Sequence, residues 1–393
     1  MSRLGLDATE LASCVGCGLC LPHCPTFRVT GEEGLSPRGR IDAIRAVEWR
    51  DAPVDDDFLH FTETCVQCRG CEPACPSGVP FGHLIEGTKA TLAAERIITP
   101  RWQRLAYRVL RHHRSLLVGS TVLALAQRMR LVPKRAGLAP LPLRRGALPD
   151  GTAPTGTDPD VWLFTGCVMD AWMRSTHRAT AALVRATGHS FRWSSSAAGC
   201  CGALHVHAGL HDEAGDLARR VMEALPGNAT VLVNSAGCGA ALKDYGHLLG
   251  TAEAATFSAR VLDINEWLAD HVDELPSARA PLGPVVVQDP CHLRHVQRRH
   301  ESVWTVLARY AELIELYDDG VCCGAGGAYS ALQPELAGAV RERKLAAIAR
   351  ATEGIGPTVV ASANPGCAMH LAAAGLHVEH PVDLVARAAG LLS

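Results

Sequence analysis

Sixteen cysteines carry the clearest chemistry in this sequence, and all of them fall into compact groups. Near the N-terminus, two runs share the spacing C-x2-C-x2-C-x3-C-P, one over residues 14–25 and one over residues 65–76. Three thiolates at spacings of two can wrap one face of a cubane iron–sulfur cluster, while the fourth ligand comes from elsewhere. The doubled run is more specific than the paired C-x2-C units of zinc sites. It predicts two [4Fe-4S] clusters.

The last cysteine of each run is expected to cross to the other cluster, as it does in two-cluster ferredoxins. A proline follows it in both runs, Pro25 and Pro76, and helps to turn it away from its own loop. One predicted ligand set is Cys14, Cys17, Cys20 and Cys75. The other predicted set is Cys65, Cys68, Cys71 and Cys24.

Residues 26–64 separate the two runs and contain a helical pattern over Ile41–Trp49. We therefore expect residues 1–95 to form an α-helical ferredoxin domain, in which helices support the two cluster loops. Arg38 and Arg40 precede that pattern. They either lie close to the clusters, where positive charge raises the potential, or are surface charges, and the surface position is the simpler expectation.

The remaining cysteines form a repeat. The first copy has Cys167, the adjacent pair Cys200 and Cys201, and Cys238, and the second has Cys291, the pair Cys322 and Cys323, and Cys367. Short β-rich runs alternate with Ala-rich helical runs throughout this half, which is the pattern of an α/β fold. We expect two tandem α/β units, residues 156–278 and 279–393, so that the chain as a whole is α+β.

Each cysteine group of the repeat follows a short apolar run that is typical of a strand. These runs are residues 161–164, 191–193 and 230–233 in the first copy, and 285–287, 313–317 and 358–361 in the second. Ligands of parallel sheets gather beyond the carboxyl ends of the strands. The three cysteine groups of each copy are therefore expected to converge on one site.

Adjacent thiolates fit poorly into one tetrahedral ion site, but they can hold two atoms of a larger body, so we favour an iron–sulfur cluster in each copy. Two alternatives stay open. One is zinc, with a nearby histidine as an additional ligand: His205, His207, His292 or His370. The other is a disulfide or redox-active pair formed by the adjacent thiols.

Residues 96–155 are expected to be a helical linker. Trp102, Leu105 and Val109 recur at helical spacing, with arginines on the other faces, which indicates a basic amphipathic helix. Such a helix either docks on its own protein or contacts an anionic membrane surface or a partner subunit. The apolar run Leu116–Ala126 is too short to span a membrane.

The net charge of −2 gives no electrostatic reason to expect nucleic acid. The N-terminal residues contain no apolar signal segment, which favours a reducing cytoplasm where thiols persist. There is no G-x-G-x-x-G turn, G-x-S-x-G elbow or H-E-x-x-H pair to indicate hydride or hydrolytic chemistry.

The two ferredoxin-type runs followed by two "CCG" repeats resemble the iron–sulfur subunit of glycolate oxidase. The same features occur in subunits of anaerobic glycerol-3-phosphate dehydrogenase, some lactate dehydrogenases and heterodisulfide reductases. The resemblance implies an electron-transfer subunit. It would relay electrons from separate flavoprotein subunits, which oxidise glycolate to glyoxylate, to a quinone or another acceptor, in the cytoplasm or peripherally on the inner face of its membrane.

The chain departs from the fullest form of that repeat, in which the last cysteine belongs to a C-x2-C pair. Ser235 and Asn364 stand where the first cysteine of each pair would be, so each copy offers four thiolates. Two other functions stay open. The repeats could themselves reduce a disulfide or a quinone, or they could be zinc-bound interaction modules.

Overall fold

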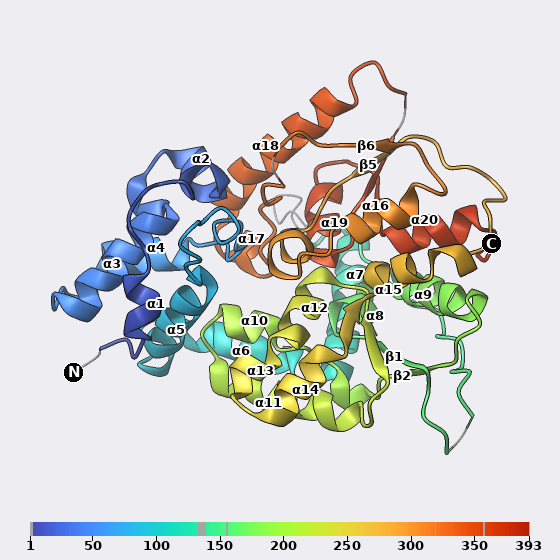
Figure 1. Ribbon diagram of the computed structural model, residues 1–393, viewed down its shortest axis with the longest axis horizontal. Helices are drawn as coiled ribbons and strands as arrows, with labels where there is room; N and C mark the ends of the chain where they lie inside the picture. The colour runs from blue at the N-terminus through green and yellow to red at the C-terminus, as the bar shows by residue number, and fades with distance from the viewer. Residues whose placement is uncertain (1–2, 133–138, 155, 319, 357, 393) are drawn as a thin grey trace.

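The computed structural model describes residues 3–132, 139–154, 156–318, 320–356 and 358–392. A helical N-terminal unit lies at one end, and the two repeats lie side by side against it (Figure 1). Of the expected linker, residues 133–138 and 155 lie outside the described residues. No helix in the described ranges is both long and apolar enough to cross a bilayer.

The N-terminal unit is built from short helices, as the sequence predicted. They are α1 (Ala8–Ala12), α2 (Pro25–Thr30), α3 (Pro37–Trp49), α4 (Asp56–Glu63) and α5 (Phe81–Ala94). Helix α3 begins where the Ser36 side chain accepts a hydrogen bond from the Gly39 amide, and α4 begins in the same way at Asp55. Their apolar faces form one core that includes Ile44, Leu84 and several of the cysteines.

Two further helices, α6 (Arg101–Leu110) and α7 (His113–Arg128), connect this unit to the repeats. Helix α7 packs on the first repeat, where the Trp172 indole donates to the Ser120 hydroxyl at 3.0 Å. His113 Nε2 lies 2.9 Å from a carboxylate oxygen of Asp170. One side of the α6–α7 hairpin therefore packs on the rest of the protein.

The first repeat is a four-stranded parallel sheet in the order β2-β1-β3-β4. Its strands are β1 (Val161–Phe164), β2 (Phe191–Trp193), β3 (Thr230–Val233) and β4 (Val261–Asp263). Its helices are α8 (Val168–Trp172), α9 (Arg174–Ala186), α10 (Ala203–His207), α11 (His211–Ala224), α12 (Ala236–Lys243), α13 (Tyr245–Leu249), α14 (Ala252–Ala259) and α15 (Ile264–Asp270).

The second repeat has the same topology, in the order β6-β5-β7-β8. Its strands are β5 (Val285–Val287), β6 (Leu313–Ile314), β7 (Val359–Ala361) and β8 (Val378–Glu379). Its helices are α16 (Glu301–Leu307), α17 (Tyr329–Leu332), α18 (Pro334–Ala351), α19 (Pro365–Ala372) and α20 (Pro381–Ala388), with a π-helical turn at His292–Val296.

All six predicted strands are present, although β6 is shorter than the predicted run 313–317. The fourth strand of each sheet, β4 or β8, is not followed by a cysteine group and was not predicted. The repeats share one hydrophobic core, which contains Val161 and Leu268 from the first repeat and Val285 and Val385 from the second. Helices α9 and α20 meet across it, and the Thr176 hydroxyl donates to the Asp383 carboxylate at 2.6 Å.

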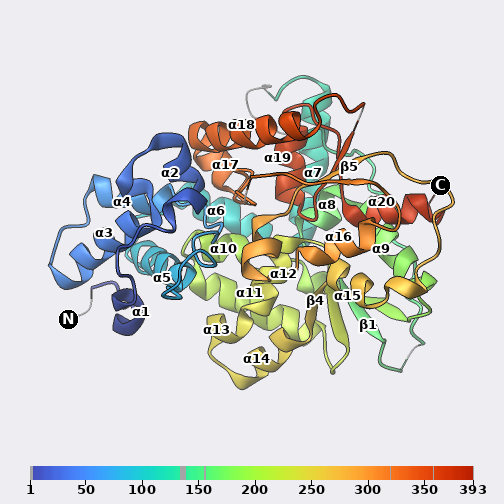
Figure 2. The same cartoon turned by 45° about the horizontal axis from the view of Figure 1, so that its top comes forward.

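The second repeat also contacts the N-terminal unit. Helix α18 packs against α2, and Figure 2 shows α17 and α18 beside the N-terminal helices. Sequence order alone would have put the first repeat next to the ferredoxin-like unit, whereas both repeats touch it in the fold.

Candidate iron–sulfur centres

The eight cysteines of the two N-terminal runs surround two adjacent cavities. The first cavity is lined by Cys14, Cys17, Cys20 and Cys75, and also by Cys71. The second is lined by Cys24, Cys65, Cys68 and Cys71. Cys24 and Cys75 thus each border the cavity of the other run, which supports the crossed ligand sets. Each cavity thus has at least the four thiol donors that a [4Fe-4S] cluster requires, and Cys71 borders both.

The two loops reach this arrangement with the same backbone conformation but different residues. In the first run Gly16 and Gly18 have φ of 70° and 84°, and in the second run the equivalent Gln67 and Arg69 have φ of 56° and 57°. A left-handed conformation costs a non-glycine residue free energy, so the surroundings must hold it. The Gln67 amide donates to the His207 carbonyl at 3.0 Å, and Arg69 pairs with Glu72 at 2.9 Å.

We call the first cavity and its cysteine run outer, and the second cavity and its run inner. Burial sets the chemistry of the cysteines in the inner cavity. Burial raises the pKa of the Cys68 and Cys71 thiols well above the ordinary value. A thiolate there needs a compensating positive charge, which iron supplies when a cluster is bound. Of the sixteen cysteines, only Cys17 is exposed.

Arg40 lies against the inner cavity rather than on the surface, so the simpler expectation was wrong for this residue. Its side chain is only 2% exposed, and it donates to the carbonyls of Leu35 and Phe61 and to the Thr26 hydroxyl. Its Nη1 lies 3.9 Å from Cys24 Sγ. A buried guanidinium thus lies beside one of the predicted cluster ligands.

Arg38 occupies an intermediate position. Its side chain is 36% exposed and pairs with Glu33, while Nη1 donates to the Gly16 carbonyl of the outer loop at 3.1 Å. Arg38 therefore holds the loop of the first cysteine run, while Arg40 joins the segments that flank the second cavity.

In the first repeat, four sulfurs form a continuous row at the carboxyl ends of β1, β2 and β3. Cys167 contacts Cys200, Cys200 contacts its neighbour Cys201, and Cys201 Sγ lies 3.2 Å from Cys238 Sγ. The predicted convergence of three loops is therefore present. All sixteen cysteines are free thiols, so the adjacent pair forms no disulfide here.

The second repeat has the same row. Cys291 contacts Cys322, and Cys323 contacts Cys367. The Gly324 amide donates to Cys322 Sγ at 3.3 Å. Gly324 has φ of 90°, and a Cβ there would lie 2.6 Å from the Ala337 carbonyl oxygen, so only glycine lets the chain turn at this point.

The two positions that lack the expected cysteine face each other across the repeats. Asn364 Nδ2 donates to Cys367 Sγ at 3.5 Å, and Asn364 Oδ1 accepts from the Gly237 amide at 3.1 Å. The Ser235 hydroxyl lies 3.5 Å from the same oxygen. Asn364 is thus a hydrogen-bonded bridge between the two rows of sulfurs.

Histidines surround these rows in different ways. His205 contacts Cys200, and His292 Nδ1 lies 3.4 Å from Cys291 Sγ. His370 Nε2 lies 3.4 Å from the Ala337 carbonyl, and His207 stacks obliquely on His292 at 5.6 Å. Within the described residues, no cysteine belongs to a group of three ligand atoms within 4.8 Å of one another.

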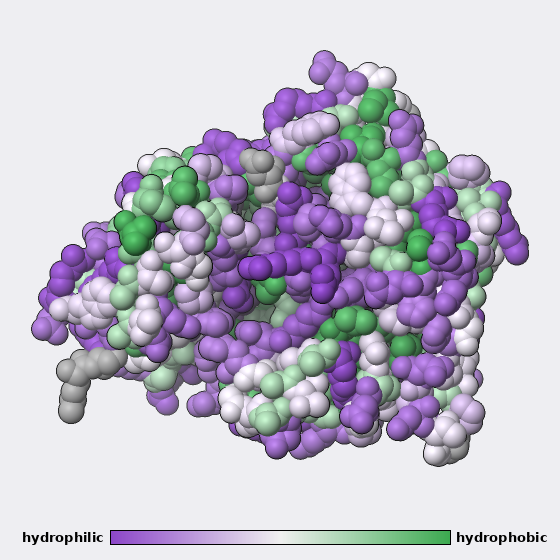
Figure 3. All heavy atoms as spheres, viewed as in Figure 1, coloured by the Kyte–Doolittle hydropathy of each residue, from purple (hydrophilic) through white to green (hydrophobic). Residues whose placement is uncertain are grey.

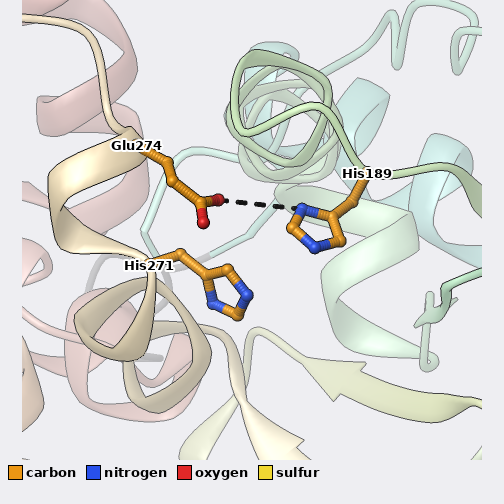
Figure 4. A group of neighbouring side chains, drawn as sticks. All are labelled: His189, His271 and Glu274. Atoms are coloured by element: carbon orange, nitrogen blue, oxygen red, sulfur yellow. Dashed lines mark ion pairs between the residues drawn. The ribbon is translucent and has the colours of Figure 1, made fainter.

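One compact group of metal-ligand types does occur elsewhere, and sequence reasoning missed it because no motif links its members. His189, His271 and Glu274 lie within 4.8 Å of one another (Figure 4). His189 precedes β2, so the group sits at the amino ends of the strands. It is therefore separate from the cysteine rows.

The four cysteine sites are close neighbours. Val66, Cys68, Cys291 and Cys322 belong to one buried apolar cluster, which joins the inner N-terminal cavity to the second repeat. Another cluster joins Leu116 of α7 to Cys167 and Cys200 of the first repeat.

Comparison with known proteins agrees with this organisation. The model of a 4Fe-4S dicluster domain matches residues 10–79, and that of a cysteine-rich domain matches residues 161–243 and 285–372. The probable glycolate oxidase iron–sulfur subunit of Bacillus subtilis is 32% identical, covering 98% of this chain and 95% of the relative. The glycolate oxidase iron–sulfur subunit of Escherichia coli is 30% identical, covering 96% and 94%.

This chain belongs to the family of glycolate oxidase iron–sulfur subunits. A more distant relative, 27% identical over 97% of this chain and 95% of its own length, is a subunit of the dihydromethanophenazine:CoB–CoM heterodisulfide reductase of Methanosarcina acetivorans. As in the rest of its family, iron–sulfur clusters are the cofactors of this chain, and the predicted mixed fold is confirmed. The ligand assigned to each cluster remains a prediction.

The crossed ligand sets predict paired phenotypes. Cys24→Ser should perturb the same cluster as Cys68→Ser, and Cys75→Ser the same cluster as Cys17→Ser, because each fourth ligand comes from the other run. Iron content and electron paramagnetic resonance of the dithionite-reduced chain would identify the cluster affected in each variant. Matching spectra for Cys24→Ser and Cys17→Ser would contradict the crossing.

Replacing Arg40 should destabilise the N-terminal unit. Arg40→Met removes the nearest donor to the Phe61 carbonyl and one of two close donors to the Leu35 carbonyl, which keeps the Thr26 hydroxyl. We expect a loss of about 1–3 kcal/mol in all. Urea unfolding of the holoprotein, followed by helical circular dichroism, would measure the change in unfolding free energy. The matched Arg38→Met variant should lose clearly less stability than Arg40→Met, because its ion pair with Glu33 is partly exposed. Equal losses would show that burial of Arg40 contributes nothing.

Proposed function

We propose that this chain is the electron-transfer subunit of a complex that oxidises glycolate to glyoxylate. Flavoprotein subunits of the same complex would carry out the oxidation, and this chain would pass their electrons on to a quinone. The similarity to two glycolate oxidase iron–sulfur subunits along almost the whole chain carries this proposal. The contacts among the four cysteine sites provide its physical support.

Those contacts suggest an order for the centres. The two N-terminal cavities share Cys71 as a wall, so they come first and second. The inner cavity meets the second repeat, because Cys68 and Cys291 belong to one buried group of apolar side chains. The second repeat meets the first through Asn364. The order in space would thus be outer loop, inner loop, second repeat and first repeat.

Asn364 gives this order a continuous connection at its last step. The path runs from Cys367 Sγ through the Asn364 amide to the Gly237 amide, which adjoins Cys238. A hydrogen bond to a ligand sulfur also raises the potential of a cluster. Asn364 would therefore both tune the centre of the second repeat and couple it to that of the first.

The outer end suits a protein partner. Cys17 is exposed, and the neighbouring Val15 and Leu19 are 74% and 57% exposed. Apolar side chains beside an accessible redox centre form a small surface on which a flavoprotein subunit could dock. Electrons would then enter at the outer loop and leave near the first repeat.

The other end suits a membrane surface. The apolar side of α6 does not pack on the protein, because Trp102 and Leu105 are 63% and 60% exposed; on α7, Val118 and Val122 are also exposed. Between Glu95 and Asp150 the sequence has twelve Arg and Lys residues but no Asp or Glu. Basic and apolar side chains on one exposed hairpin suit anionic lipids.

The hairpin that carries this surface also covers the first repeat. Leu116 on the inner side of α7 belongs to the same buried group of apolar side chains as Cys167 and Cys200. Docking of α6–α7 on the inner face of the cytoplasmic membrane would thus bring the last centre close to membrane quinones. Reduction of a disulfide, suggested by the heterodisulfide reductase relative, is the second candidate function.

The proposed substrate is testable with the assembled complex. Glycolate added anaerobically should bleach the visible absorbance of the clusters when the flavoprotein subunits of the complex are present, and should not do so with this chain alone. Lactate and glycerol 3-phosphate serve as competing substrates at the same concentration. Faster reduction by glycerol 3-phosphate would reject the assignment to glycolate.

Membrane contact predicts a lipid-specific effect. The double variant Trp102→Glu and Leu105→Glu should bind vesicles containing phosphatidylglycerol at least tenfold more weakly than the original chain, because it loses apolar contact and gains charge repulsion. Co-sedimentation would measure this. Tyr317→Glu is the matched control, since Tyr317 is 88% exposed but lies in the second repeat. Equal binding to phosphatidylcholine vesicles would contradict electrostatic attraction.

A further inference from the structure

A cavity lies where the N-terminal unit and both repeats meet. Arg69 and Glu86 of the N-terminal unit line it, together with Cys201 and His211 of the first repeat and His292 of the second. Its empty volume is about 700 Å³, including space open to solvent. Figure 3 shows a hollow near the centre of this face, surrounded largely by hydrophilic residues. No single unit could form this cavity alone.

The walls of the cavity combine apolar surface with unused polar atoms. Ala240, Ala241 and Val206 supply apolar surface. His207 Nδ1 and His211 Nε2 are buried and have no hydrogen-bond partner among the described residues. Buried polar atoms without partners are uncommon and point to an unseen ligand or water.

Glu86 contributes a buried carboxyl group to the same cavity. It lies on α5 and is 8% exposed. Burial raises its pKa to about 7, with Arg69 acting in the opposite direction. The charged and titratable groups around it are Arg69 from the second cysteine run, His83 and Lys89 from α5 itself, Asp244 between α12 and α13, and His292 from the second repeat.

A carboxyl group of this kind can deliver protons at neutral pH, since general acids act best when their pKa lies near the working pH. Glu86 shares its cavity with Cys201, which belongs to the row of the first repeat. A source of protons and a ligand of a redox centre thus face the same space.

We propose that this cavity binds and reduces a small acceptor of the quinone class, with Glu86 as its proton donor. The inference rests on the proposed function, because it names the place on this chain where the electrons leave. The quinone takes up two electrons, one at a time, from the side of Cys201. It also takes up two protons through the Glu86 carboxyl, which is reloaded from water, so that both carbonyl groups become hydroxyl groups.

The polar atoms favour a quinone over a disulfide. His207 Nδ1 and His211 Nε2 are the buried ring nitrogens of this cavity that have no partner among the described residues. An imidazole N–H can donate a hydrogen bond to the carbonyl oxygen of a quinone, whereas the sulfur atoms of a disulfide are weak acceptors. The alanines and Val206 suit the face of a ring.

Reoxidation of the reduced holoprotein tests this proposal without the flavoprotein subunits. The chain is reduced with dithionite, freed of excess reductant and mixed in a stopped-flow instrument with duroquinone or with ferricyanide, which takes electrons without protons. Glu86→Gln should slow reoxidation by duroquinone at least tenfold and leave ferricyanide unaffected. In the original chain the duroquinone rate should fall as the pH rises through 7, while the variant should lose this dependence.

Two further variants sharpen the result. His211→Gln should weaken duroquinone binding, so that a higher duroquinone concentration is needed for half of the maximal reoxidation rate. Asp383→Asn should change neither this concentration nor the rate. Asp383 is a matched control because burial raises its pKa to about 6, yet it lies between α9 and α20, outside the cavity. Unchanged duroquinone rates in Glu86→Gln, equal slowing with ferricyanide, or faster reoxidation by glutathione disulfide than by duroquinone would each overturn the proposal.

A failure of this experiment is distinguishable from a failure of the proposed function. Dithionite reduces the centres directly, so the reoxidation rates do not depend on which substrate the partner subunits oxidise. Glycolate-dependent bleaching, in turn, does not depend on where the acceptor binds.

Discussion

The burial of sulfur is the constraint on which the rest of the structure depends. Fifteen of the sixteen cysteines are buried or partly buried, and a buried thiolate is unfavourable unless positive charge or hydrogen bonds compensate it. Iron supplies most of that charge, while Arg40 and the backbone amides of glycine-containing turns supply the remainder. The short helices of the N-terminal unit and the strand ends of the repeats are the scaffold that holds these donors in place.

Because the sulfur sites must lie close to one another, the chain joins its units through them. The second cysteine run contacts both repeats, through Gln67 and His207 on one side and through Cys68 and Cys291 on the other. Asn364 closes the remaining gap between the repeats. Where the fullest form of the repeat has a cysteine, this chain has an asparagine that links the two cysteine rows by hydrogen bonds. Such a link suits a chain that conducts electrons.

Much of the site was predictable because its information is local. The spacing of each cysteine run, and the position of each repeat cysteine after an apolar strand, are properties of short segments. The burial of Arg40, the outward face of α6 and the cavity around Glu86 were not predictable, because each depends on what a distant part of the chain places beside it. Glu86 occupies an ordinary helical position, and nothing in its neighbours along the sequence marks it. Strands β4 and β8 were missed since no cysteine follows them.

The apolar core that the two repeats share has a consequence for folding. Val161 and Val285 begin equivalent strands, yet their side chains belong to one continuous interior. Neither repeat can bury this shared surface alone, so we expect the two halves to stabilise each other despite their separate cysteine rows. Oxidative damage to the cluster of one half would then loosen the other as well.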